Sequence, residues 1–364
     1  MDLERLAAAG WYDPEAPDAA DRRAMFELFD GLGLSTDEVL AAFEHDHIHS
    51  AGIDALLRRG ELSARDVAAE LGADVADVVD TYRLLGIRLD DLDAPTLSPG
   101  EVELVGLLSG DSPTFEPAEI QEINRAASAA LSMLAESIVA VFVAGAEGRL
   151  ASSEQVGWRE RAEITQAAGE LGVRFGHAVG LLFRHHLRQA VERQRSSMVA
   201  AESRMLRTMT VGFVDLVGFT SMSSSMTTAE LVDFIRGFEA RSYDVAHRGG
   251  GRIVKIIGDE VMVAALTVQQ GCGIVLDLIE EFRTSDTAPR GGVAAGEVIG
   301  RLGDYFGPVV NLASRLVDLA VPGEVLAPAT IAEQLGGAFR CEPAGRRQLK
   351  GFPEPVAAVS VLRG

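Results

Sequence analysis

The pattern of apolar residues changes near residue 208, and this change limits most strongly the folds that the 364-residue chain can adopt. Up to about residue 195 the apolar residues recur at helical spacing, and one stripe in Ala19 to Leu34 contains Met25, Phe26, Leu28, Phe29 and Leu32. After Thr208, short runs rich in β-branched residues alternate with helical stretches. Because a chain of this length is too long for one ordinary core, the pattern predicts two domains of different class.

We expect an all-helical domain over residues 1–195, a helical connector over 196–208 and a second domain over 209–364. The segment from His185 to Thr208 contains no Pro or Gly, which favours a continuous helix there. In the second domain we expect strands at 209–216, 252–257, 260–266, 291–298, 323–327 and 355–362, and helices at 228–248, 268–283 and 309–320. This order predicts an α+β chain whose second domain is an α/β sandwich with a mixed sheet.

The charge is negative and unevenly distributed. The chain carries a net charge of −21, of which −18 falls on residues 1–200 and −3 on the remainder. Ser63 to Ile87 has the pattern of a DNA-binding helix-turn-helix, but Glu61 to Asp93 contains nine acidic and three basic residues. Such a surface repels phosphate, so we expect no nucleic-acid partner and interpret the segment as an ordinary helical pair.

Location is predicted from cysteine use and hydropathy. Cys272 and Cys341 show neither a CxxC spacing nor a disulfide framework, which favours the cytoplasm. The first residues lack the basic and apolar regions of a signal peptide. Ala126 to Ala146 is long enough to span a membrane but contains Glu136, so we expect a buried core or dimer helix and no membrane span.

Lysine is scarce, since only Lys255 and Lys350 occur among the 33 basic residues. An ammonium and a guanidinium are not interchangeable at a tight site, so both lysines are candidate binding residues. Lys255 lies in the apolar run RIVKII, where burying a charge is unfavourable without a partner. An edge-strand lysine that deters aggregation and an exposed turn lysine are the alternative interpretations of Lys255 and Lys350.

Two aspartates lie where apolar runs meet glycine-containing turns. Asp215 is the fourth residue of GFVDL (212–216), and Asp259 follows Gly258 in a tight hairpin between two apolar runs. Two carboxylates at neighbouring strand ends could hold two divalent ions for an in-line phosphoryl displacement. Each aspartate is also explained as a turn residue that binds no metal, and the residues alone leave both alternatives open.

A third run, DYFGPVVNLASRL, begins at Asp304 and continues as a helix after a Gly-Pro break. Asn311 and Arg315 are four residues apart and share one face of that helix. Arg315 could clamp a phosphate and Asn311 could orient a sugar, although an exposed polar stripe accounts for the same pair.

The order of these motifs resembles the catalytic domain of class III adenylyl and guanylyl cyclases. The resemblance covers about residues 208 to 362 and depends on DLVGFT, KIIGDE, DYFG with VN and SR, and LKG. It implies a ferredoxin-like core within the sandwich. It also implies that two Mg²⁺ or Mn²⁺ ions per active site are held by Asp215, Asp259 and the carbonyl of Leu216.

The resemblance implies further roles for the other motif residues. Asn311 and Arg315 would stabilise the transition state, and the triphosphate would contact Gly218, Phe219, Thr220 and Lys350. Many family members have KGK at this last motif, whereas Phe352 replaces the second lysine here. Lys255 and Asp304 would read the purine, and a donor with an acceptor matches N1 and N6 of adenine, so the pair predicts ATP over GTP.

The family forms head-to-tail dimers with active sites between the chains, which implies a homodimer of two equivalent sites. A guanylate cyclase and a nucleotide-binding sensor without catalysis are the alternatives. The stretch from Gly296 to Asp304 is short for the family and implies a short dimerisation arm.

The helical half resembles, more loosely, the N-terminal domains of soluble actinobacterial cyclases, which can inhibit catalysis and respond to pH. Histidines that could titrate near neutrality are His45, His47, His49, His185 and His186.

Overall fold

The computed structural model describes residues 1–45, 47–48, 51–57, 60–109, 114–143, 145, 156–197, 206–284 and 288–364. The chain divides into two compact units, Met1–His185 and His186–Gly364, with the long helix α10 (Trp158–Ser197) contributing to both. The described part of the connector predicted at 196–208 consists of the end of α10 and the start of strand β1 (Leu206–Val217). Residues 206–208 are strand, so the helix expected to continue to Thr208 ends before Leu206. Residues 198–205 lie outside the described residues, and the domain boundary stays a prediction.

The first unit is helical, as predicted. Besides the first part of α10 it contains α1 (Leu3–Ala8), α2 (Ala19–Gly31), α3 (Thr36–Glu44), α4 (Ala51–Leu57), α5 (Ala64–Leu71), α6 (Val75–Leu84), α7 (Gly100–Leu108) and α8 (Pro117–Phe142).

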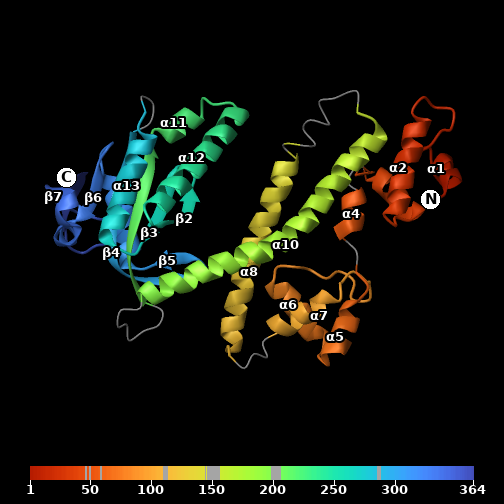
Figure 1. Cartoon of the computed structure of the whole chain (residues 1–364), viewed down its shortest axis with the longest axis horizontal. Helices are drawn as coiled ribbons and strands as arrows, with labels where there is room; N and C mark the ends of the chain where they lie inside the picture. Colours follow the sequence, from red (N-terminus) through yellow and green to blue (C-terminus); the bar gives the residue numbers. More distant parts are fainter. Residues whose placement is uncertain are drawn as a thin grey trace. The chain divides into compact units, whose positions relative to one another are not determined.

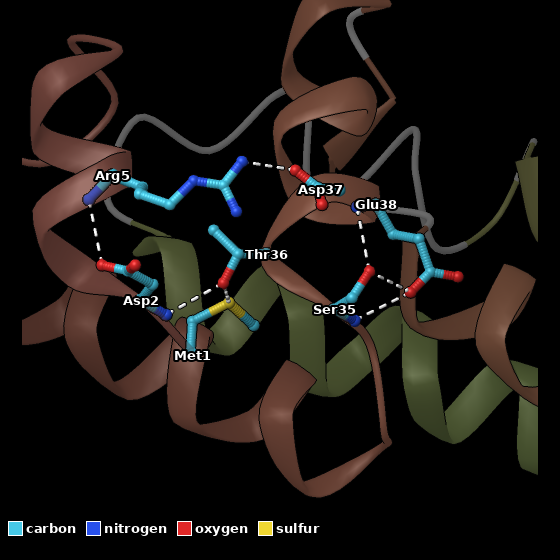
Figure 2. A network of polar contacts seen from close by, with 7 residues as sticks. All are labelled: Met1, Asp2, Arg5, Ser35, Thr36, Asp37 and Glu38. Atoms are coloured by element: carbon cyan, nitrogen blue, oxygen red, sulfur yellow. Dashed lines mark hydrogen bonds and ion pairs between the residues drawn. The ribbon is translucent and has the colours of Figure 1, made fainter.

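Polar contacts fix the starts of α1 and α3 against each other, as Figure 2 shows. The amide of Asp2 donates to the hydroxyl of Thr36 at 2.9 Å, and Arg5 forms an ion pair with Asp37 at 2.5 Å. Ser35 and Glu38 form a capping box that satisfies otherwise unpaired amides at the start of α3. These contacts orient helices that already pack through Leu6, Phe26 and Phe43 in one apolar core.

A second core joins α5, α6 and α7 around Val67, Val78 and Tyr82. The helical pair expected between Ser63 and Ile87 is therefore present, with Gly72 in a left-handed conformation at its turn.

Helix α8 is not a buried core helix, one of the two alternatives expected for this segment, whereas the other, a dimer helix, stays a prediction. Its most apolar window is not buried in the structure, and Leu131, Met133 and Val141 are exposed. By length and composition α8 could cross a membrane, which is weak evidence for a span. The absence of a membrane span therefore stays a prediction.

The described residues of the second unit contain eight strands (Figure 1). Six of them are the expected strands in the expected order, whereas the strands at Asp304–Phe306 and Phe339–Arg347 were not expected. The strands are β1 (Leu206–Val217), β2 (Arg252–Ile257), β3 (Glu260–Ala265), β4 (Ala288–Arg301), β5 (Asp304–Phe306), β6 (Val325–Pro328), β7 (Phe339–Arg347) and β8 (Val356–Arg363). The helices between them are α11 (Phe219–Ser223), α12 (Thr228–Arg248), α13 (Val268–Phe282), α14 (Pro308–Leu319) and α15 (Ala332–Leu335).

The strands form one mixed sheet in the order β2-β3-β1-β4-β6-β8-β7, with β5 paired to β4. Strands β2, β3, β1 and β4 are antiparallel, whereas β4 and β6 are parallel. With α12 and α13 as connections, the first four strands have the βαββαβ order of a ferredoxin-like core, as predicted.

The two faces of the sheet carry different helices because side chains alternate along each strand. Val214 of β1 belongs to the core formed with α12 and α13, whereas Met209, Val211 and Phe213 belong to the core formed with α14. Asp215 continues the second series, so the alternation places it on the α14 face of the sheet.

The small size of Gly292 sets the position of α14. A Cβ atom on Gly292 would lie 2.3 Å from the carbonyl oxygen of Ala313 and 2.4 Å from the amide nitrogen of Val317. We expect Gly292→Ala to lower the free energy of unfolding by about 1 to 3 kcal/mol, because α14 must shift. Chemical denaturation measures this value, and Gly237→Ala is the control, since a Cβ atom there meets nothing within 4 Å. Equal stabilities for the two variants would contradict this packing.

Candidate active site

The end of β1 brings three ionisable residues together. Asp215 lies opposite Glu260 of β3 on one side and opposite Arg290 of β4 on the other. Asp259 occupies the tight turn before β3, after Gly258 with a φ of 63°. The left-handed glycine allows this short hairpin, so Asp259 stays beside the carboxyl end of β1. Leu216 follows Asp215 with its side chain in the core.

Arg290 is a site residue that the sequence analysis missed. Its Nε and Nη2 atoms each lie 2.8 Å from Oδ2 of Asp215, and its Nη1 donates to the carbonyl of Asp318 at 2.8 Å. The available signal was a single arginine in PRGGVAAG, a run that is otherwise apolar or small.

Several carboxylates gather around this one guanidinium. Burial, with the negative charges of Asp215, Asp318 and Asp259, raises the pKa of Glu260 to about 7. Burial is also the largest cause of the raised pKa of Asp259, and Asp215 adds to it. The site is therefore too negative for its degree of burial, which a bound cation would relieve.

The donor set fits a cation that shares its coordination with a ligand. Within the described part of the chain, no group of three or more His, Cys, Asp or Glu side chains could hold a metal ion by itself. Magnesium is commonly bound by one or two carboxylates together with substrate phosphates and water. Asp215 and Asp259 offer the two carboxylates that such an arrangement requires.

The structure joins Lys255 and Asp304, two other predicted site residues, although they are 49 residues apart in the sequence. Nζ of Lys255 lies 2.6 Å from Oδ2 of Asp304, and the amide of Tyr305 donates to Oδ1 at 2.7 Å. The side chains are 39% and 24% exposed, so the pair is partly open to a ligand. Strand β5 makes the contact possible because its hairpin with β4 carries Asp304 toward β2.

Helix α14 carries Asn311 and Arg315, as predicted. It begins after Gly307, whose φ is 139°, and Pro308 occupies its first position. Asn311 is exposed, and Nη1 of Arg315 lies 3.1 Å from Oδ2 of Asp318, one turn further on. Among the contacts described, none joins Asn311 or Arg315 to Asp215.

The remaining predicted residues lie in two turns. Gly218, with a φ of 94°, precedes the short helix α11, which begins with Phe219 and Thr220. The first backbone amides of α11 have no acceptor within the helix and can donate hydrogen bonds to an anion. Lys350 is exposed in the turn between β7 and β8, and Phe352 packs against the core cluster that contains Leu316 and Leu349. The described contacts do not connect Lys350 to the other site residues.

Comparisons with known proteins agree with this arrangement. Residues 201–361 match the family model described as "Adenylate and Guanylate cyclase catalytic domain". An uncharacterised protein of Mycobacterium tuberculosis is 31% identical over 98% of this chain and 93% of its own length. A pH-sensitive adenylate cyclase of the same species is 27% identical over 95% of this chain and 89% of its own. An adenylate cyclase of Glutamicibacter nicotianae is 46% identical over 34% of this chain and 32% of its own length.

The matched residues include every motif from Asp215 to Lys350. These motifs lie on the strands, helices and turns of the second unit described above. The chain belongs to the class III adenylyl and guanylyl cyclase family.

Proposed function

We propose that the protein is an adenylate cyclase that converts ATP to 3′,5′-cyclic AMP and pyrophosphate. The contact between Lys255 and Asp304 carries the proposal, because it sets one donor and one acceptor side by side. Adenine presents an acceptor at N1 and a donor at its N6 amine, which this pair can satisfy. Guanine presents the reverse and would leave partly buried polar groups unpaired, so a guanylate cyclase is the less favoured alternative.

In this proposal Asp215, Asp259 and the carbonyl of Leu216 hold two Mg²⁺ or Mn²⁺ ions. Bound divalent ions neutralise phosphate charge and stabilise the attacking and leaving oxygens. Arg290, which pairs with Asp215, is a further guanidinium within reach of a phosphate near these carboxylates.

The remaining residues bind and orient the nucleotide. Asn311 orients the ribose so that its 3′-oxygen attacks the α-phosphorus, and the bond to the leaving pyrophosphate breaks. Arg315 stabilises the charge that develops on the phosphate. The amides of Gly218, Phe219 and Thr220, with Lys350, contact the triphosphate.

We further propose a homodimer with two equivalent sites, in which the metal-binding aspartates of one chain act with the other chain's Lys255, Asp304, Asn311 and Arg315. Among the described contacts none joins Arg315 directly to Asp215, and Arg290 and Asp318 stand between them. A nucleotide-binding sensor without catalysis is disfavoured, because both aspartates and the helix arginine are present.

The test is product identification with the purified full-length chain. ATP labelled at the α-phosphate, incubated with Mn²⁺, should yield labelled cyclic AMP and one pyrophosphate per turnover. Formation of ADP or AMP alone would assign a different phosphate chemistry, and tight ATP binding without turnover would favour the sensor.

We also propose that the helical region inhibits the cyclase and makes it responsive to pH. The similarity to the pH-sensitive adenylate cyclase extends over 95% of this chain and so includes this region. His45 and His47 lie with ring centroids 5.9 Å apart, and His185 and His186 are exposed on α10. His49 lies outside the described residues.

Removing residues 1–185 should therefore raise the rate by about fivefold and change its pH profile. The fragment from His186 retains the complete second unit with its own core, and circular dichroism verifies its fold. The comparison uses initial rates of both proteins between pH 5.5 and 8. This range spans the ordinary pKa of histidine, about 6.5. Superimposable profiles with equal rates would remove the regulatory proposal.

A further inference from the structure

Asp318 lies in the last turn of α14 between two arginines of the candidate site. Its side-chain Oδ2 is 3.1 Å from Nη1 of Arg315, and its backbone carbonyl accepts from Nη1 of Arg290 at 2.8 Å. Asp318 lies outside the sequence motifs of the candidate site. It is the one residue of the described chain for which contacts to both of these arginines are found.

The contact with Arg290 fixes the backbone position of Asp318, from which its carboxylate side chain extends. The last carbonyls of a helix lack partners within the helix, and Arg290 supplies a donor to one of them. Two nitrogens of the Arg290 guanidinium contact the carboxylate of Asp215. The end of α14 is therefore connected to β4 and β1. The Asp318 backbone is therefore placed by the rigid sheet rather than by the helix end alone.

The contact with Arg315 limits the freedom of a long side chain. Arg315 is 42% exposed, so packing alone does not fix its guanidinium. A carboxylate at one nitrogen restricts the rotamers of the side chain and leaves the other N–H donors of the fork for a phosphate. Such a partner has a larger effect on turnover than on nucleotide affinity when the arginine acts in the transition state.

We propose that Asp318 is a positioning residue that holds the Arg315 guanidinium in its catalytic orientation. The inference depends on the proposed cyclase function, in which Arg315 stabilises the transition state. Asp318 itself does not contact the nucleotide in this proposal.

Steady-state kinetics of Asp318→Ala, Asp318→Asn and Asp318→Glu test the inference. We expect Asp318→Ala to lower kcat by about tenfold, with KM changed less than about twofold. Asparagine should lose less because it keeps an acceptor, and glutamate should restore the most because it keeps the charge. Asp277→Asn is the matched control. Asp277 lies on α13, another helix of the same unit, and the substitution removes a carboxylate that forms an ion pair with Arg363. A kcat for Asp318→Ala within twofold of that control would overturn the proposal.

Mixed dimers separate positioning of Arg315 from an effect on the metal-binding carboxylates. A dimer of one Asp215→Asn chain and one Arg315→Ala chain has one intact site, which uses Arg315 of the first chain. Adding Asp318→Ala to that first chain should lower the rate, and adding it to the second should not. A loss on placement in the second chain, which supplies Asp215 to the intact site, would overturn the proposal and show that Asp318 acts on the metal side instead.

A crystal structure of Asp318→Ala keeps the two proposals distinguishable if the wild-type protein makes no cyclic AMP. We expect the Arg315 guanidinium to occupy one position in the wild-type protein and to move or lose density in the variant. An unchanged Arg315 would contradict the inference whatever the activity, whereas absent turnover with a displaced Arg315 would contradict only the proposed function.

Discussion

Asp215→Asn should abolish cyclic AMP formation, lowering kcat by on the order of 10³ or more. The substitution preserves the size of the side chain but removes the charge that a divalent ion requires. It also leaves Arg290 facing a neutral amide in place of the carboxylate it contacts through two nitrogens at 2.8 Å. Initial rates with ATP and Mn²⁺ measure the loss, and thermal unfolding of the variant shows whether the fold remains.

A second inactive variant turns this loss into a test of the dimer. Arg315→Ala should also be nearly inactive, by about 10² to 10³. Mixing the two variants should restore about a quarter of the wild-type rate, because half of the dimers are mixed and each has one intact site. Mixed dimers that form without any recovery would contradict shared active sites.

Exchanging the charges of Lys255 and Asp304 should produce the second large effect. In Lys255→Glu with Asp304→Lys, the acceptor and donor change places, which matches guanine rather than adenine. We expect the ratio of kcat/KM for ATP to that for GTP to fall by at least about 10², because mismatched polar groups are left unpaired. The ion pair within the chain is retained, so the fold should tolerate the exchange.

Lys255→Met is the control for this experiment. It removes the donor without creating an acceptor, so it should slow ATP turnover and give no gain with GTP. A doubly exchanged variant that keeps its preference for ATP would show that other residues read the purine.

The sequence predicted the core of the second unit closely, because its strands are bounded by clear turns. Strand β2 and helix α12 have the expected bounds, and Gly258 marked the hairpin before β3. Strand β5 has only three residues, and β7 has a register shift between Pro343 and Gly345, so neither showed a readable alternation.

Residues of the candidate site could be predicted from the sequence only where they belong to a recognisable motif. Asp215, Lys255 and Arg315 stand in motifs, whereas Arg290 and Asp318 become visible only through their contacts. Arg290 meets Asp215 across an antiparallel ladder 75 residues away in the sequence, and single-sequence periodicity does not give that register.

In the first unit, periodicity predicted helices but could not predict what covers them. Helix α8 is apolar enough to suggest burial, yet its apolar window is not buried in the structure. An apolar stripe indicates that a surface favours a partner and does not identify that partner.

The most direct measurement is the rate of cyclic AMP formation from ATP by the full-length protein, compared with cyclic GMP formation from GTP at equal concentrations of nucleotide and Mn²⁺. We expect cyclic AMP to be the main product and Arg315→Ala to abolish its formation. A higher rate with GTP, or a wild-type rate no greater than that of Arg315→Ala, would contradict the assignment as an adenylate cyclase.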